Sequence, residues 1–411
     1  MAASAVILAV LAPLVATLAL VLYTMARYRG RRPRVTIASG FGGGSRSRVK
    51  TMSEVMDILE AIPFRRGVPL SIAIALYTLL DVIPMLLNIS GASAGFVYPY
   101  PDVFEPVMLD SQDGTPLYGM LAMQQGESRL PALVFVHGLF GSKNSFNMLS
   151  LAVRAYYDWG FHVFALDLRN HGDSARFSEA PTTWGFRESD DILATAEYLY
   201  SLDRVSTVGV CGVSMGAASS LLAAARSRLD GSLSGGVLAI NGYADADRIT
   251  RHVSAREPGS IESFLHWLLF CVLLAAKTLL CGPRPLANIR EYTRQVASQY
   301  YEMTEDELYQ KASPVNVMRE LEVPCLILHS LDDTIVPVGE ADDLIAAAKD
   351  NPMVGSLVMP RGGHGMYQFT NPRWFYETVR TFFKYWAEFE LGPDFIPDGI
   401  DSIHLFGNPN N

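Results

Sequence analysis

The sequence predicts an α/β protein built on a mostly parallel, doubly wound sheet, and two observations carry that prediction. Short, continuously apolar runs recur along the chain between residues 105 and 359. Most of these runs are followed by a polar loop that contains glycine, and then by a stretch with helical periodicity. Apolar runs of this kind are typical of strands that are buried on both faces, and their alternation with helices is typical of a parallel sheet.

The expected elements follow in order along the chain. The first two strands, at 105–110 and 116–123, flank Gln112-Asp113-Gly114, which is a hairpin signal. The other strands are expected at 133–136, 162–166, 208–211, 236–240, 325–328 and 356–359, and the helices at 145–159, 188–200, 340–349 and 372–389. The alternation stops between residues 240 and 325, a gap that is too long for a single crossover. We therefore expect an inserted helical unit in that gap.

The region before the first strand has the features of a membrane-anchoring segment. Residues 5–25 are apolar and uncharged, which is long enough to span a bilayer core, and the basic residues follow this run rather than precede it. This order favours an uncleaved anchor over a signal peptide. The stretch 35–66 is expected to hold a flexible linker and a short amphipathic helix near 52–62.

A second apolar run, at 68–87, is interrupted by Asp81. Residues 1–66 contain ten Lys and Arg, whereas residues 67–128 contain none. This asymmetry favours a helical hairpin with a cytoplasmic basic loop, which leaves the main domain on the non-cytoplasmic face. Because a carboxylate inside a membrane is costly, the alternative is that 68–87 packs on the domain or lies in the interface, with a cytoplasmic main domain.

The stretch 264–280 is apolar almost all round and lies within the expected insertion. If this stretch crossed the membrane, Ser214 would be separated from every residue that follows. We therefore expect a lid helix that lies on the membrane surface or over a pocket, with His266 and Lys277 near its polar edge. A plain buried helix is the alternative.

The charge distribution limits the possible partners. The first 66 residues carry a net charge of +7, which leaves −16 for the rest of a chain whose total is −9. An acidic main body is poorly suited to bind nucleic acid through phosphate contacts. The four cysteines lack metal-ligand spacing, and we expect neither a metal nor an organic cofactor.

Residues 208–226, VGVCGVSMGAASSLLAAAR, predict a strand, a sharp turn and a helix, with Ser214 at the turn. Gly212 and Gly216 flank this serine at the spacing of a nucleophile elbow, where larger side chains would collide with neighbouring elements. A serine hydroxyl is a weak nucleophile unless a histidine takes its proton and a carboxylate orients that histidine. Ser214 is therefore a candidate nucleophile that needs two partners.

The candidate partners follow later strands. His364 comes after the last expected strand, between glycines that let its loop reach over the edge of the sheet. For the acid, spacing alone allows either Asp332 or Asp333, and the alternative role for at least one of the two is to cap the following helix. Further candidates follow the preceding strand: Asp245 and Asp247.

Backbone N–H groups are also needed to stabilise the oxyanion that forms during acyl transfer. The amide of Met215, at the start of the helix, is one expected donor. The amide of Leu139, in the loop after the strand at 133–136, is the other. His137 in that loop is expected to be a structural brace rather than a proton carrier.

Several motifs together resemble the serine hydrolases of the α/β-hydrolase fold. They are HGLFGSKNSF (137–146), LDLRNHGDS (166–174), GVSMGAA (212–218), SPVNVMRELEVPCLILHSLDDTIVP (313–337) and GGHG (362–365). The chain is most similar to Bem46-like and ABHD-type membrane-associated hydrolases. The resemblance implies that Ser214 is the nucleophile, His364 the base and Asp333 rather than Asp332 the acid, with the Leu139 and Met215 amides as oxyanion donors. Ser330 stands where many relatives have glycine.

The expected organisation along the chain is a series of seven segments. They are an anchor with a basic flank (1–34), a linker and short helix (35–66), a second membrane-associated helix (67–98), the first part of the hydrolase core (99–243), a helical lid insertion (244–320), the second part of the core (321–391) and an irregular tail (392–411). The expected function is a membrane-anchored hydrolase of lipophilic or lipid-derived carboxylic esters. A peptidase, thioesterase, acyltransferase or non-catalytic membrane scaffold with the same fold are the alternatives.

Overall fold

The computed structural model describes residues 34–36, 50–64, 98–126, 128–227, 231–255 and 288–387, together with residue 286 and eight residues between 264 and 275. Its centre is a nine-stranded sheet with the order β1-β9-β8-β7-β6-β4-β5-β3-β2. Strands β4 to β9 are parallel, whereas β1, β2 and β3 pair antiparallel at the two edges. The prediction of a mostly parallel sheet is confirmed.

The strands lie close to where the apolar runs predicted them. They are β1 (Arg34–Thr36), β2 (Glu105–Asp110), β3 (Pro116–Ala122), β4 (Leu130–Val136), β5 (His162–Asp167), β6 (Val205–Val213), β7 (Val237–Ile240), β8 (Cys325–Ser330) and β9 (Val354–Met359). Strand β1 was not expected. It lies at the junction of the expected anchor and linker, and it extends the sheet by pairing with β9.

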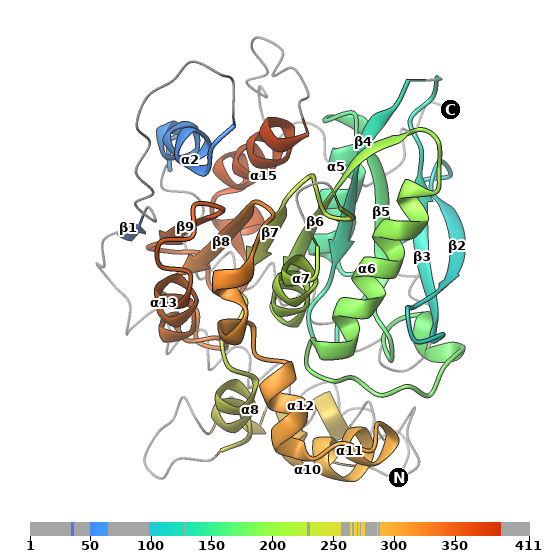
Figure 1. Cartoon of the computed structure of the whole chain (residues 1–411), viewed down its shortest axis with the longest axis vertical. Coiled ribbons are helices and arrows are strands. Elements are labelled where there is room, and N and C mark those ends of the chain that lie inside the picture. The colour runs from blue at the N-terminus through green and yellow to red at the C-terminus, as the bar shows by residue number, and fades with distance from the viewer. Residues whose placement is uncertain are drawn as a thin grey trace.

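Helices cover both faces of the sheet. The helices are α2 (Met52–Ala61), α5 (Phe146–Tyr157), α6 (Phe186–Tyr200), α7 (Met215–Ala225), α8 (Ala246–Ser254), α10 (Ile289–Tyr292), α11 (Ser298–Tyr300), α12 (Glu305–Lys311), α13 (Val338–Ala347), α14 (Tyr367–Thr370) and α15 (Pro372–Trp386). Short helical turns complete the set: η3 (Ser174–Arg176), the π-helical η4 (Thr293–Ala297), η5 (Pro314–Asn316) and η6 (Met318–Glu320). In Figure 1, α6, α7 and α13 lie in front of the sheet, and α2, α5 and α15 lie behind it.

Alternate side chains of the central strands form two separate cores. In β4, Val134 and Val136 belong to the core under α6 and α7, whereas Leu133 and Phe135 belong to the core under α5 and α15. Successive side chains of a strand point to opposite faces, so a strand with both faces covered is a continuous apolar run. This is why the strands were recognisable in the sequence.

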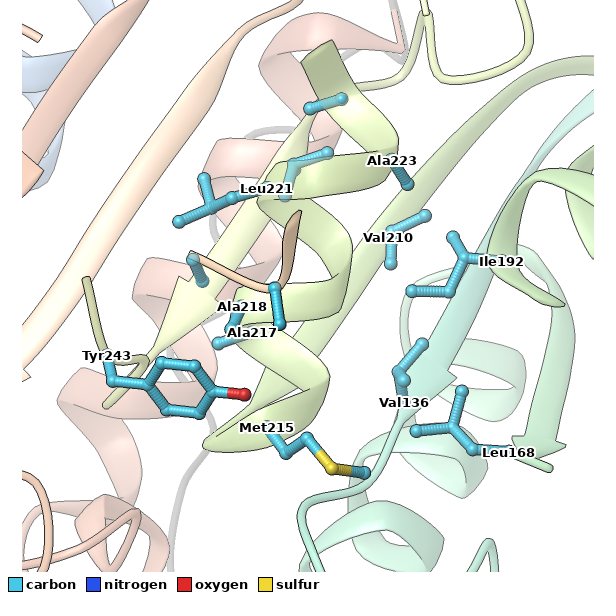
Figure 2. Packing of buried hydrophobic residues seen from close by; sticks show 14 of the residues in the cluster. Val136, Leu168, Ile192, Val210, Met215, Ala217, Ala218, Leu221, Ala223 and Tyr243 are labelled. Atoms are coloured by element: carbon cyan, nitrogen blue, oxygen red, sulfur yellow. The ribbon is translucent and has the colours of Figure 1, made fainter. Parts of the chain in front are cut away.

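Helix α7 packs tightly on the first of these cores. Its small side chains let its backbone approach the sheet, and Figure 2 shows Val210 of β6 together with Ala223 of α7 and Ile192 of α6. All three side chains are buried. Close packing of this kind fixes the start of α7, and therefore the turn that precedes it, relative to the sheet.

Helix α2 is part of the domain. Its apolar face, which includes Met56 and Leu59, is buried in the core that also contains Phe382 and Phe383 of α15. The stretch 35–66 is thus not only a linker, because its helix packs on the hydrolase core. The segments 5–25 and 68–87 lie outside the described residues. Within the described part of the chain, no helix is both long and apolar enough to cross a bilayer.

The segment between β7 and β8 contains helices α8, α10, α11 and α12, which lie together below the sheet in Figure 1. Because α8 starts soon after the end of β7, this group lies at the carboxyl edge of the parallel strands. The described residues of the apolar stretch 264–280 are helical, and Leu273 and Leu274 are buried in the core. His266 and Lys277 lie outside the described residues.

Candidate active site

Ser214 lies in a strained turn between β6 and α7. Its φ of 57° and ψ of −120° are rarely adopted by a residue with a side chain. The Ser214 amide donates to the Ile240 carbonyl of β7 at 2.9 Å, which holds the turn against the neighbouring strand. The hydroxyl therefore lies at the carboxyl edge of the sheet, on a backbone that is fixed on both sides.

The two glycines around Ser214 are required by close backbone contacts. A Cβ atom at Gly212 would lie 2.3 Å from the Gly216 carbonyl oxygen, and one at Gly216 would lie 2.5 Å from the His137 carbonyl oxygen. Real Cβ contacts are essentially never this short. The structure thus gives a steric reason for both glycines, which the sequence pattern predicted.

The loop after β4 lies directly on the turn. A Cβ atom at Gly138 would be 2.9 Å from Cβ of Ser214, so the backbone that leads into Leu139 passes next to the serine. Met215 is the first residue of α7, and N–H groups at the first turn of a helix have no partner within that helix. The loop that leads to Leu139 thus passes beside Ser214, and Met215 follows Ser214 directly in the chain.

His137 braces this loop. Its Nδ1 donates to the Gly138 carbonyl at 2.8 Å, and its Nε2 accepts from the Leu168 amide at 3.1 Å. Nε2 therefore joins the loop after β4 to the loop after β5, while Nδ1 forms a bond within the loop after β4. This geometry agrees with a structural role rather than a role in proton transfer.

His364 and Asp333 are brought together by the loops after β9 and β8. The Nδ1 atom of His364 lies 2.9 Å from Oδ2 of Asp333. Asp333 is buried, whereas the His364 side chain is 14% exposed. The loop of His364 also reaches the elbow, because a Cβ atom at Gly365 would lie 3.2 Å from the side chain of Val213, the residue before Ser214.

The environment keeps Asp333 ionised. Burial alone would raise the pKa of Asp333, but the charge of His364 and its hydrogen bond lower it, and the net pKa lies below the ordinary value. The Ile335 and Val336 amides add hydrogen bonds to Oδ1 at 2.9 and 3.0 Å. A carboxylate held in this way can orient an imidazole and stabilise its protonated form.

Asp332 has a different position. Its Oδ1 accepts the amides of Gly362 and Gly363 at 2.9 and 2.8 Å, so it holds the loop that carries His364. Burial raises the pKa of Asp332 to about 6. Spacing alone left the two aspartates open, and the structure puts Asp333 rather than Asp332 against the histidine.

The two aspartates after β7 are placed elsewhere. Asp245 caps α8 by accepting the Arg248 amide at 3.0 Å. Asp247 forms ion pairs with Arg251 and Arg290 at 2.8 and 2.5 Å. Both side chains are therefore committed to the helices after β7, and neither takes the place of Asp333.

Two polar side chains at this site were not predicted as site residues, although Ser330 was noted as a departure from the family pattern. The Asn241 side chain donates to Oδ2 of Asp333 at 2.7 Å, and the Ser330 hydroxyl donates to the Gly363 carbonyl at 2.7 Å. Each stands at the carboxyl end of a strand, which was the one signal available. A triad calls for a carboxylate and a histidine at these ends, so the sequence did not mark the amide of Asn241 or the hydroxyl of Ser330 as part of the site.

The helical segment after β7 lies next to the oxyanion loop. The rings of Phe270 and Phe140 are 6.2 Å apart, and Phe140 is a buried residue with a φ of 64°. Phe140 directly follows Leu139. The conformation of the loop after β4 is therefore coupled to the packing of the segment that contains Phe270.

No group of three or more His, Cys, Asp or Glu side chains that could hold a metal ion occurs among the described residues. A family model described as "Alpha/beta hydrolase family" matches residues 133–378, which is more than half of the chain. The chain belongs to the alpha/beta hydrolase family. This match and the mostly parallel sheet confirm the α/β-hydrolase fold that the motifs predicted.

Individual relatives are more distant or match only in part. The sn-1-specific diacylglycerol lipase ABHD11 of Mus musculus is 44% identical over 71 residues, which are 17% of this chain and 22% of the lipase. The uncharacterized protein YqkD of Bacillus subtilis is 24% identical over 61% of this chain and 70% of its own length. The esterase Pf2001 of Pyrococcus furiosus superposes with a TM-score of 0.51 at 18% identity, covering 69% of this chain and 93% of the esterase. That last likeness concerns the fold alone.

Proposed function

We propose that this protein is a serine hydrolase that cleaves carboxylic esters through an acyl-enzyme intermediate. The observation that carries the proposal is the 2.9 Å contact between His364 and Asp333, on a loop that packs against the strained turn of Ser214. Three groups with these chemical properties at one edge of a sheet can activate a hydroxyl for attack on an acyl carbon.

In the proposed reaction, the Ser214 hydroxyl attacks the carbonyl carbon of the ester, and Nε2 of His364 accepts the hydroxyl proton. Asp333 keeps Nδ1 of the ring protonated and stabilises the imidazolium. The amides of Leu139 and Met215 donate to the oxyanion of the tetrahedral intermediate. His364 then protonates the departing alkoxide, which leaves as the alcohol. A water molecule, deprotonated by the same histidine, releases the acid and restores Ser214.

Lipophilic or lipid-derived esters are the proposed substrates. The support is the apolar stretch 264–280 between β7 and β8, whose Phe270 packs on Phe140 beside the oxyanion loop. We propose that this stretch is a lid. The local similarity to a diacylglycerol lipase is consistent with this choice but covers only 17% of the chain.

The substrate class is tested with p-nitrophenyl esters of increasing chain length, presented as monomers and as micelles. We expect kcat/KM to increase from acetyl to long-chain esters and to be higher on micelles. Ser214→Ala should reduce kcat by about 10⁴-fold or more, because the nucleophile is removed. A strict preference for acetyl esters would contradict the lipid proposal, whereas turnover of amides or thioesters in preference to esters would favour a peptidase, thioesterase or acyltransferase.

We also propose that the protein is attached to a membrane through residues 5–25. The support is the length of this apolar run and the basic residues that follow it. The location of the catalytic domain depends on whether 68–87 also spans the bilayer, in which case the domain is non-cytoplasmic. Protease digestion of sealed vesicles tests the location: a protected domain supports the hairpin, and a digested domain supports a single anchor. Extraction with alkaline carbonate tests the attachment, and release of the intact chain would contradict it.

A further inference from the structure

Asn241 occupies a fixed position between the acid and the base of the proposed triad. It is the first residue after β7, it is fully buried, and its φ of 50° lies in the left-handed region that asparagine tolerates better than most residues. Strand β7 lies between β6 and β8 in the sheet. Its carboxyl end is therefore between the strand that leads to Ser214 and the strand that leads to Asp333.

The side-chain amide of Asn241 uses both of its polar atoms at this site. Its Nδ2 donates to Oδ2 of Asp333 at 2.7 Å and to the Gly363 carbonyl at 3.1 Å. Its Oδ1 accepts the Gly365 amide at 3.2 Å. One side chain thus contacts the carboxylate and both neighbours of His364 in the chain.

We propose that Asn241 is a positioning residue that fixes Asp333 and the loop of His364 relative to each other and lowers the basicity of the Asp333 carboxylate. The expected effect of Asn241 on catalysis rests on the proposed function. Asn241 acts through Asp333 and His364, and it touches neither the hydroxyl of Ser214 nor a substrate in this assignment.

Asn241 is expected to lower the basicity of Asp333 because it shares an oxygen of that carboxylate with His364. Oδ2 of Asp333 accepts hydrogen bonds from both Asn241 and His364. A second donor on an anionic oxygen stabilises its negative charge and reduces the attraction that remains for the imidazolium. Oδ1 is held by two backbone amides, so the carboxylate should stay in place when Asn241 is removed. Loss of the amide should therefore raise the pKa of His364.

Other groups hold the same loop but do not replace this contact. Ser330 donates to the Gly363 carbonyl, and Asp332 accepts the amides of Gly362 and Gly363. The other titratable groups that act on Asp333 are His329, whose Nε2 lies 3.9 Å from Oδ2, and Tyr367, in addition to Asp332 and His364. His329 and Asp332 are not bonded to Asn241 in this arrangement, whereas Tyr367 also interacts with the Asn241 side chain.

The test uses Asn241→Gly, because glycine accepts the positive φ without strain and removes the side chain that carries the amide. We expect kcat to fall about 10- to 100-fold, as for other residues that orient a reacting group, with KM changed less than about threefold. The acid limb of the pH profile of kcat/KM should move upward by about half a unit to one unit. If the glycine variant does not fold, Asn241→Ser is used, since its short side chain cannot span the same contacts.

A matched control is Asn351→Gly. The Asn351 amide is also buried, and it donates to the carbonyls of Met318 and Leu321, near the amino ends of β8 and β9. This variant should lower the thermal midpoint, while the acid limb stays within about 0.2 units of the wild type because no charged group of the site is affected.

An NMR titration of His364 in protein labelled at histidine gives a second readout that needs no turnover. His364→Gln assigns the signal. An increased pKa of His364 in Asn241→Gly supports the inference, even if the ester substrates proved wrong. An unchanged or lowered pKa, together with an acid limb that does not move, would overturn it and leave Asn241 with a purely structural role. Failure of the proposed function is seen separately, as wild-type protein that does not turn over any ester.

Discussion

Asp332 and Asp333 are neighbours in the chain, yet they bind different partners and have opposite pKa shifts. Asp333 accepts hydrogen bonds from His364, Asn241 and two backbone amides, which outweigh the effect of burial and lower its pKa. Asp332 is equally buried, and burial raises its pKa to about 6 despite the hydrogen bonds from the Gly362 and Gly363 amides. For Asp333 the hydrogen bonds and the charge of His364 outweigh burial, whereas for Asp332 burial outweighs the hydrogen bonds.

The raised pKa of Asp332 predicts a specific dependence of stability on pH. Because the folded state binds this proton more tightly than the unfolded state, whose pKa is near 4, the group stabilises the fold below about pH 4. That contribution, at most about 3 kcal/mol for a shift of two units, is lost as the pH rises through about 6. We expect the free energy of unfolding of Asp332→Asn, relative to wild type, to increase by up to this amount between pH 4 and pH 7.

Urea denaturation of both proteins across that pH range measures the difference directly. Contributions of all other groups are common to both proteins and cancel. A difference that does not change with pH would show that Asp332 titrates normally. Asp333 would then still be assigned as the acid from its contact with His364, but the raised pKa of Asp332 would be wrong.

At the scale of elements, the site depends on where strands end rather than on any one motif. The ends of β4, β6, β7, β8 and β9 supply Leu139, Ser214, Asn241, Asp333 and His364. Parallel strands bring their carboxyl ends to one edge, and backbone contacts as short as those of Gly138 and Gly216 hold the loops there. Small changes in these glycines should therefore affect the site more than changes of similar size elsewhere.

Gly216→Ala tests this point. The added Cβ would lie 2.5 Å from the His137 carbonyl oxygen, a backbone atom that cannot move without the loop of Leu139. We expect a loss of about 1–3 kcal/mol in the free energy of unfolding and a fall in kcat of at least tenfold.

The matched control is Gly339→Ala in α13, where an added Cβ meets nothing within 4 Å. Alanine is a better helix former than glycine, so this variant should be about 0.5–1 kcal/mol more stable with unchanged kcat. Thermal unfolding and ester hydrolysis measure both effects. Equal changes in stability and in kcat in the two variants would contradict the close approach of α7 to the loop after β4.

The elements were predictable from the sequence to different degrees. Strands β4 to β9 were recognised because burial on both faces makes each one an apolar run, as in β4 and β6, whereas β2 and β3 were recognised from the hairpin signal between them. Strand β1 has three residues and joins the sheet only through distant β9, so no local pattern reveals it. The docking of α2 on α15 was missed for the same reason, although the helix itself was predicted.

At the site, too, contacts between residues that are distant in the sequence were not predictable. Ser214 and His364 stand out because their surroundings have the glycine pattern of sharp turns. The choice between Asp332 and Asp333 depends on which side chain faces the ring, and one residue of difference in the chain does not determine that. Asn241 was missed because its function depends on contacts with residues 92 and 124 positions away.

For the whole molecule, the described residues form a hydrolase domain that includes an N-terminal strand and helix as well as the predicted core. Helix α2 contributes buried side chains to the same core as α15, and β1 extends the sheet next to β9. The chain that leads toward 5–25 is thus attached to the edge of the sheet at β9, the strand that precedes His364. A membrane anchor at 5–25 would therefore be joined to the domain by packed structure as well as by a linker.

The central claim is that Ser214 is a nucleophile activated by His364, and covalent labelling tests it most directly. Purified full-length protein is treated with a fluorophosphonate probe, and the adduct is located by mass spectrometry. The account predicts one adduct per chain on Ser214 in the wild type, no adduct in Ser214→Ala, and labelling slowed by about 10³-fold or more in His364→Gln, since the base is absent. Absence of labelling in folded wild-type protein, or equal labelling of the wild type and Ser214→Ala, would contradict it.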